Sequence, residues 1–140
     1  MSSYDELRLH LDTLKNFSDD RGSLVAITGG IEIPFKIARV FYTFKNAPDI
    51  QRGAHAHRSC FQFLVCLSGS MEVIVNDGVT QGSIHLSTPD QGLLIPPLVW
   101  SHQQKYTSDA VCLVLASEVY SKSEYIYDYK EFLTLVKGRN

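Results

Sequence analysis

Two histidines separated by a single residue, His55 and His57, are the most chemically informative pair in the sequence. On an extended segment, residues two apart point to the same face of a sheet, so both imidazoles converge on one side. An imidazole titrates near pH 6.5 and can take up or release a proton close to neutral pH, and its uncharged nitrogen also binds metals. The pair therefore indicates either acid–base catalysis or a metal site.

Short runs of alternating apolar residues surround this pair and predict β-strands. The runs lie at residues 7–11, 24–27, 37–44, 61–67, 71–75, 84–86, 93–95 and 111–116. Turn-forming sequences such as Asn76-Asp77-Gly78 separate them. Short strands at this regular spacing predict an all-β sandwich or barrel. One helix is expected, from Ser123 to Lys137, with Ser123 as its N-cap and an apolar stripe, including Tyr125, that serves packing.

The composition is that of an ordinary globular domain, and it excludes several functional classes. The 140 residues include 13 Lys and Arg against 15 Asp and Glu, which gives a net charge of −2. With no basic stripe, there is no counterion-release drive for binding nucleic acid. No run approaches the roughly 18–20 apolar residues of a membrane helix, and the N-terminus lacks a signal-like apolar core. We expect one domain over residues 1–140, a cytoplasmic location and no membrane partner.

The histidine pair belongs to a longer series of residues that resembles the two-motif pattern of the cupin superfamily. The series comprises His55-x-His57, Gln62, Gly69, Gly92, Pro97 and His102. The resemblance implies a double-stranded β-helix, or jelly roll, here with a short C-terminal helix. Metal-binding cupins place a Glu four or five residues after the His-x-His motif, and this chain has Phe61 and Gln62 there. Loss of the anionic ligand weakens a hard divalent ion site, so we expect no metal.

A more specific resemblance covers nearly the whole chain and is to the sugar 3,4-ketoisomerases, the WxcM-like family of cupins. It rests on Asp20-Arg21-Gly22-Ser23-Leu24, Arg39-Val40-Phe41-Tyr42, Arg52-Gly53-x-His55-Ala56-His57, Leu64-Val65-Cys66-Leu67-x-Gly69-Ser70, Val99-Trp100 and Leu115-Ala116-Ser117. The resemblance implies conversion of dTDP-4-keto-6-deoxy-D-glucose to its 3-keto isomer, a step toward dTDP-3-amino-3,6-dideoxy sugars, and a dTDP-linked keto sugar as ligand.

The chemistry of that reaction fits the residues. Moving a carbonyl from C4 to C3 needs a base for the C3 proton, a group that stabilises the enediol and a proton donor at C4, but no redox cofactor. By resemblance, His57 is the leading base, His55 is its partner at the sugar oxygens, and Tyr42 donates a hydroxyl to the enediol. The division of roles between the two histidines stays open, as does the configuration of the product at C4.

The diphosphate of such a ligand needs guanidinium groups, and Arg52, Arg39 and Arg21 are the candidates. Arg52 is favoured for the diphosphate, whereas Arg39 or Arg21 is as well suited to pairing with a buried carboxylate. Trp100, Gln62 and His102 complete the expected substrate-binding set, with packing as the alternative for Trp100. Some relatives have a histidine directly after Val-Trp, where this chain has Ser101. The one-residue slip turns His102 away from the pocket unless a bulge re-aims it.

Two alternative functions are weighed against the isomerase. A metal-dependent cupin dioxygenase would use His55, His57, Gln62 and His102, and a non-catalytic sugar-nucleotide binding module would use the histidines as ligand contacts only. The resemblance also implies a homodimer with exchange of N-terminal strands. The alternating segment from Leu7 to Leu11 is the one that would add to a neighbour's sheet.

Overall fold

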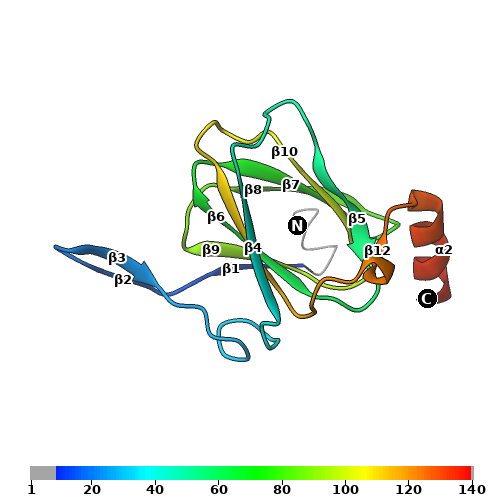
Figure 1. Ribbon diagram of the computed structural model, residues 1–140, viewed down its shortest axis with the longest axis horizontal. Helices are drawn as coiled ribbons and strands as arrows, with labels where there is room; N and C mark the ends of the chain where they lie inside the picture. The colour runs from blue at the N-terminus through cyan, green and yellow to red at the C-terminus, as the bar shows by residue number, and fades with distance from the viewer. Residues whose placement is uncertain (1–8, 140) are drawn as a thin grey trace.

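The structure is a computed structural model that describes residues 9–139. Two five-stranded sheets face each other, and every strand pair in them is antiparallel. The first sheet runs β1 (His10–Thr13), β9 (Gln91–Ile95), β6 (Gln62–Ser68), β11 (Val111–Ala116) and β4 (Arg39–Phe44). The second runs β12 (Tyr125–Ile126), β5 (Arg52–His57), β10 (Trp100–Gln104), β7 (Met71–Asn76) and β8 (Gln81–Leu86) (Figure 1). The expected all-β architecture is confirmed.

Alternation along the strands builds the core between the two sheets. In β7 the side chains of Met71, Val73 and Val75 are fully buried, and the residues between them are half-buried. The central strand β6 is buried on both faces, because Phe63 and Val65 pack against a second cluster with Ile33 and Phe35 from the connection that precedes β4. Burial on both faces explains why β6 reads as a continuous apolar run rather than an alternating one.

The C-terminal segment differs from the expected helix over residues 123–137. A short 3₁₀ helix, η1 (Lys122–Glu124), is followed by β12, and the α-helix α2 begins only at Tyr129 and ends at Arg139. Ser123 is therefore not the N-cap. Asp128 has that role, since its carboxylate accepts a hydrogen bond of 2.9 Å from the amide of Lys130. Tyr125 and Ile126 join the sheet instead of the helix, because β12 pairs with the edge of β5.

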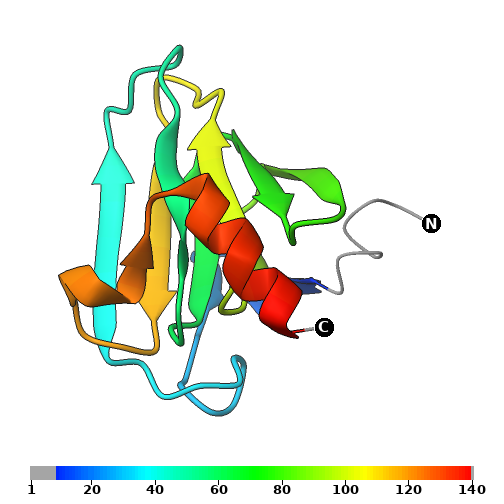
Figure 2. The same cartoon turned by 90° about the vertical axis from the view of Figure 1, so that its right-hand side faces the viewer.

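Helix α2 covers the outer face of the second sheet (Figure 2). Phe132 and Val136 pack there against Ala56 of β5 and Ile126 of β12. Phe132 is fully buried, and truncating a buried aromatic side chain costs about 3–5 kcal/mol. The helix therefore closes the outer face, and the inner face of β5 remains to line the space between the sheets.

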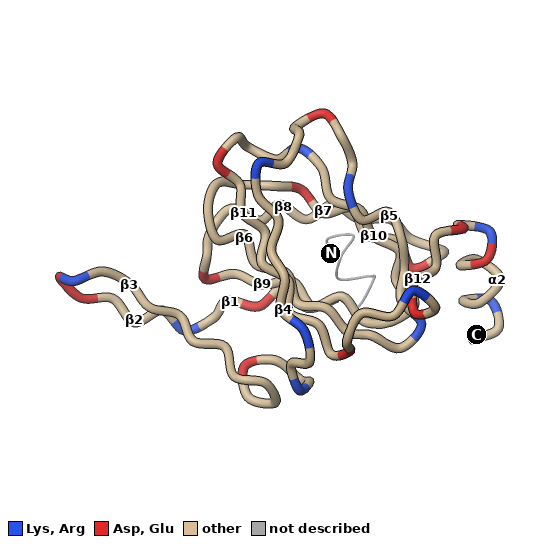
Figure 3. The backbone as a smooth tube through the Cα atoms, in the orientation of Figure 1, with Lys and Arg blue, Asp and Glu red and all other residues tan. Residues whose placement is uncertain are grey.

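The remaining two strands, β2 (Asn16–Asp19) and β3 (Gly22–Val25), form a hairpin that projects from the body of the sandwich (Figure 1). Phe17 and Leu24 face each other across it and are more than half exposed. Charged residues of both signs are interspersed over loops and strand ends (Figure 3). Within the described residues, no helix has the length and apolar character needed to cross a membrane.

Candidate active site

A cavity of about 470 Å³ opens between the two sheets, and its walls come from β4, β5, β6, β10 and β12. This volume lies in the range of small-molecule sites. Arg39 and Arg52 line it, together with His55, Gln62 and several uncharged polar or aromatic side chains. No Asp or Glu is found among the described residues that line it. The cavity therefore favours an anionic ligand.

The histidine pair lies on β5, as the alternation predicts, and both rings turn inward. The ring centroids of His55 and His57 are 4.9 Å apart with an interplanar angle of 86°. His55 lines the cavity, whereas His57 is only 5% exposed and lies behind it. The two side chains are thus arranged one behind the other. Only the first of them presents its ring to a ligand.

Both imidazoles are held in the uncharged form. Burial, assisted by the neighbouring His57, lowers the pKa of His55 from 6.5 to about 4. Burial also lowers the pKa of His57; the carboxylate of Glu124 opposes this shift and Arg39 adds to it. Among the described residues, Nδ1 of His55 and both ring nitrogens of His57 are buried without a hydrogen-bond partner. Such unpaired groups are costly, and in native proteins they frequently mark functional sites.

A bulge in β5 places Arg52 on the same side as the histidines. Simple alternation puts residues 52 and 55 on opposite faces. In the structure, however, Ser101 pairs with His55 and Gln103 pairs with Arg52, so β5 has one residue more than β10 in this stretch. Gly53 lies in the bulge with φ of +75°, a backbone conformation that favours glycine. Because of the extra residue, the side chain of Arg52 points to the inner face of the sheet and lines the cavity.

Tyr125 is a cavity residue that sequence reasoning assigned to helix packing. It lies on β12 directly opposite His57, and its ring centroid is 4.9 Å from that of His55 and 4.6 Å from that of His57. Its hydroxyl accepts a hydrogen bond of 3.1 Å from the guanidinium of Arg39. The pattern Tyr125-Ile126-Tyr127, with a buried Ile between two aromatic residues, is the strand-like signal that was available in the sequence.

The structure does not bring Tyr42 to the cavity. Arg39, Phe41 and Thr43 of β4 line it, and Tyr42 lies on the opposite face of that strand with 62% of its surface exposed. Because residues 39 and 42 differ by an odd number, a regular strand cannot direct both inward. The expected role of Tyr42 as hydroxyl donor is therefore not supported by its position.

Trp100 and His102 also lie outside the cavity. Both occupy the outer face of the second sheet, opposite Asn76 and Ile74 of β7, while Ser101 and Gln103 between and after them face inward. Trp100 packs on helix α2, with its ring 5.2 Å from that of Tyr129. The one-residue slip of His102 thus has its expected effect. The bulge lies in β5 rather than β10, so it does not re-aim this side chain.

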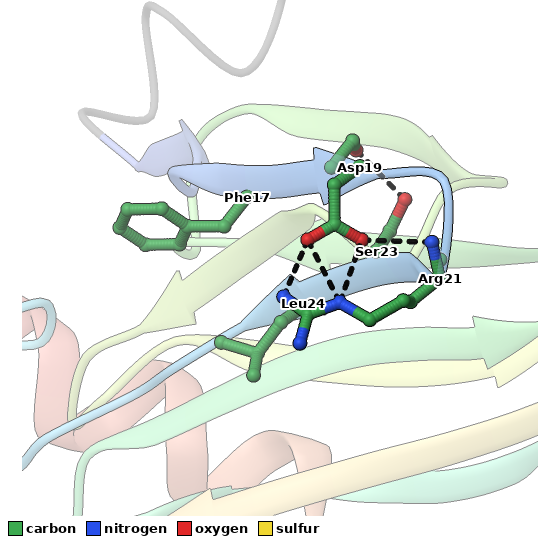
Figure 4. A pocket seen from close by; sticks show the side chains of 7 residues that line it. Phe17, Asp19, Arg21, Ser23 and Leu24 are labelled. Atoms are coloured by element: carbon green, nitrogen blue, oxygen red, sulfur yellow. Dashed lines mark hydrogen bonds and ion pairs between the residues drawn. The ribbon is translucent and has the colours of Figure 1, made fainter.

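Arg21 lies at the turn of the projecting hairpin rather than at the cavity of its own chain. Its guanidinium folds back onto the carboxylate of Asp19, 2.6 Å away (Figure 4). The hollow shown there is lined by hairpin residues only, including Phe17 and Leu24. Arg21 is largely exposed, and its carboxylate partner, Asp19, is a local and exposed one rather than the buried carboxylate of the alternative interpretation.

The ligand set required by a metal-dependent cupin is not assembled. His55, His57 and Gln62 share the inner face, but His102 is on the outer face of β10. In the part of the chain that the structure describes, no three His, Cys, Asp or Glu side chains are grouped so that they could hold a metal ion. The geometry therefore does not favour the dioxygenase alternative.

Comparison with known proteins identifies the family. The family described as FdtA, WxcM-like, C-terminal, matches residues 7–137. A protein of Aneurinibacillus thermoaerophilus, named TDP-4-oxo-6-deoxy-alpha-D-glucose-3,4-oxoisomerase, is 45% identical over 118 residues, which are 84% of this chain and 85% of that protein.

Two solved structures extend the similarity to the fold. A mutant of the 3,4-ketoisomerase QdtA from Thermoanaerobacterium thermosaccharolyticum, in complex with TDP-4-keto-6-deoxyglucose, is 39% identical with a TM-score of 0.91, covering 94% of this chain and 95% of that one. The TDP-quinovose 3,4-ketoisomerase WlaRB of Campylobacter jejuni is 41% identical with a TM-score of 0.87, covering 90% and 97%. Sequence and structure agree with the cupin architecture expected from the resemblance, and the chain belongs to the WxcM-like family of FdtA proteins.

Proposed function

We propose that this protein is a sugar-nucleotide 3,4-ketoisomerase that converts dTDP-4-keto-6-deoxy-D-glucose to its 3-keto isomer. The observation that carries the proposal is the cavity itself, which joins an uncharged imidazole to two arginines. Among the described residues that line the cavity, no carboxylate opposes these arginines. A relative at 45% identity bears the name of this activity, and a solved relative at 39% identity holds the corresponding keto sugar. The reaction needs only proton transfers, and these residue types perform them.

His55 is the base in this proposal, and His57 supports it from behind. A base must reach the C3 proton in a bound ligand, and of the two histidines it is His55 that lines the cavity. Its lowered pKa keeps the ring unprotonated at neutral pH. His57 packs edge-on against His55 and fixes the orientation of its ring. This assignment reverses the order of the two histidines that the family resemblance suggested.

Arg52 binds the diphosphate. It lies at the exposed end of β5, next to the bulge, where a charged group of the ligand stays partly in contact with solvent. A guanidinium offers paired donors that match two phosphate oxygens. Gln62 lies deeper, on β6, with 7% of its surface exposed, and contacts the sugar end.

The test is incubation with dTDP-4-keto-6-deoxy-D-glucose in deuterated buffer, followed by NMR of the sugar ring. We expect loss of the C3 proton signal and appearance of the 3-keto isomer. A parallel incubation in ordinary water, where C4 of the product carries a proton, gives the configuration of the product from the coupling constants at C4. Tight binding of dTDP with neither exchange nor product would favour the binding-module alternative. Turnover that is abolished by chelators and restored by a stoichiometric divalent metal would favour the dioxygenase-like site.

The protein is also proposed to be a homodimer. The outer face of edge strand β4 exposes Val40, Tyr42 and Phe44, each by more than half, and the hairpin exposes Phe17 and Leu24. Groups of exposed apolar side chains of this kind mark protein interfaces, and a two-stranded hairpin is marginally stable alone. A second copy carries both surfaces, so one symmetric contact covers both.

In this dimer the N-terminal strand is exchanged, as the family resemblance implies. In the single chain, β1 pairs with β9 from His10 opposite Leu94 to Thr13 opposite Gln91. The same hydrogen bonds form when β1 pairs with β9 of a second copy, so exchange costs little in contacts. Residues 7 and 8 of the expected exchange segment lie outside the described part of the chain. The cytoplasmic location expected from the sequence likewise stays a prediction.

The dimer is tested by light scattering after gel filtration. The wild-type chain should have twice the mass of 140 residues, and Leu24→Lys should shift the equilibrium toward the monomer at micromolar concentration. Because Leu24 is more than half exposed in the hairpin and belongs to neither core cluster, its replacement leaves the core between the sheets unchanged. A monomeric wild-type protein would contradict the proposal.

A further inference from the structure

We infer that Tyr125, held in place by Arg39, is the catalytic hydroxyl that carries a proton between the two sugar oxygens during isomerisation. The inference rests on the proposed ketoisomerase function and concerns a step that His55 cannot perform alone. When a carbonyl moves from C4 to C3, a proton must also arrive at O4 and another must leave O3. Two tyrosines, Tyr125 and Tyr127, line the cavity beside the histidine that removes the carbon-bound proton. Of the two, Tyr125 has the nearer ring, and its hydroxyl is the one to which Arg39 donates a hydrogen bond.

The position of Tyr125 is fixed from two sides. Backbone pairing of β12 with β5 sets Tyr125 opposite His57. Its ring then meets His55 edge-on, with ring centroids 4.9 Å apart, and stacks on Tyr127 on its other side at 5.6 Å and 11°. Tyr125 lines the cavity, so its hydroxyl is available to a ligand. Pairing and stacking together pre-organise the ring before any ligand arrives.

Arg39 supplies the charge that a phenol needs in order to release a proton. Its guanidinium donates to Oη of Tyr125 at 3.1 Å. The same guanidinium lies over the ring of Phe41 at 4.5 Å and over that of Tyr120 at 5.2 Å, so aromatic faces restrain it. It finds no acidic partner within ion-pair distance among the described residues, and its charge is available to stabilise a transient phenolate. Arg39 is therefore a positioning and charge-stabilising residue for Tyr125.

The proton balance closes with these groups. His55 removes the proton from C3; the C–H electron pair forms the C3–C4 double bond, and the carbonyl pair moves to O4, which takes a proton from Tyr125. The phenolate, stabilised by Arg39, then takes the proton from O3. The O3 electron pair forms the C3 carbonyl, and the double-bond pair takes the proton at C4 from the imidazolium of His55. Both side chains return to their starting states, with no net gain or loss of protons or electrons.

The experiment compares two rates in deuterated buffer: exchange at C3 and formation of the 3-keto product. In Tyr125→Phe, His55 still removes the C3 proton, but the intermediate lacks a donor at O4 and returns to substrate. We expect product formation to fall by about 10²-fold or more, the usual size of an acid–base contribution, and the ratio of exchange to product to rise at least tenfold. A parallel loss of both rates, or a loss below threefold, would overturn the inference.

Two further variants separate chemistry from folding. Tyr129→Phe makes the same change on helix α2, outside the cavity, and should keep both rates within twofold of the wild type. Arg39→Gln removes the charge and shortens the side chain, so that the contact with the Tyr125 hydroxyl is lost, and it should reproduce the raised ratio with little change in KM. A raised KM with an unchanged ratio would instead assign Arg39 to the diphosphate and overturn its role toward Tyr125. If the wild type forms no product, the proposed function fails rather than this inference.

Discussion

His55 shields His57 from the cavity: the two rings meet edge to face with centroids 4.9 Å apart, and only the first lines the space that a ligand would fill. Two histidines that point to the same face of one strand thus differ in their access to the cavity. The same substitution at the two positions should therefore have different consequences.

We predict that His55→Asn abolishes exchange of the C3 proton with solvent, with at least a 10³-fold loss of turnover, because it removes the base. His57→Asn should lower turnover by about tenfold, through looser packing of the His55 ring, and should retain measurable exchange. NMR of the substrate in deuterated buffer measures exchange, and a dTDP titration of both variants checks that the ligand site is intact. Retained exchange in His55→Asn together with loss in His57→Asn would return the base to His57.

The lowered pKa of His55 makes a second prediction, for the pH dependence of kcat/KM. The uncharged ring is the active form, and its pKa is about 4 in the folded protein. Activity should therefore stay level from pH 8 to about pH 5 and decline only as the pH falls through about 4. An ordinary histidine would give an acidic limb near 6.5. An acidic limb at that higher pH would show that the base is not desolvated.

Folding stability must be measured over the same pH range, because the same group couples to unfolding. Between pH 6.5 and about 4, the unfolded chain binds a proton at His55 that the folded chain does not bind. The free energy of unfolding therefore has its full value above pH 6.5 and decreases as the pH falls below it. Thermal melts followed by circular dichroism at each pH separate loss of the fold from protonation of the base.

The sequence was sufficient for most strands of the sandwich and for the inward pair of histidines, because alternation is a local property that residue types report directly. Strand parity alone also predicts that Tyr42 faces away from Arg39, and the structure agrees with parity. For Arg52, parity gives the wrong face, because it would place Arg52 opposite His55, whereas both line the cavity. The bulge at Gly53 depends on how β5 pairs with β10, which no local pattern specifies.

Tyr125 was missed for a related reason. Its spacing to Tyr129 and Phe132 fits one helix face, so a single helix explained all three residues. Backbone pairing with β5 takes Tyr125 and Ile126 into the sheet, and the helix starts after Asp128. Edge pairing between segments almost 70 residues apart, Tyr125 with His57, is a tertiary preference that overrides local periodicity.

A third prediction concerns the bulge. Gly53 has φ of +75°, and a Cβ there would lie 3.7 Å from Nε2 of His55, an ordinary contact. Gly53→Ala should thus act through backbone strain, which lowers the free energy of unfolding by about 1–2 kcal/mol. The same strain should turn the side chain of Arg52 away from its position in the cavity wall. We expect a KM for the nucleotide sugar raised by about tenfold, measured in steady-state assays.

Gly30→Ala is the matched control for the bulge. Gly30 also has a positive φ, +79°, and has open space around its Cβ position, but it lies outside the cavity lining. It should lose similar stability while its KM stays within twofold of the wild type. An equal rise in KM in both variants would attribute the effect to general destabilisation rather than to the placement of Arg52.

The exchange of β1 gives a fourth prediction, which a pair of cysteines can test. Thr13 and Gln91 are partners across the β1–β9 ladder, so Thr13→Cys with Gln91→Cys brings two thiols within disulfide reach. If β1 belongs to the second copy, oxidation links two chains, and a denaturing gel without reductant shows a band of twice the chain mass. Each single-cysteine variant is a control, since the three native cysteines are buried. A linked product that runs as a monomer would mean that β1 stays on its own chain, whatever the oligomeric state measured by light scattering.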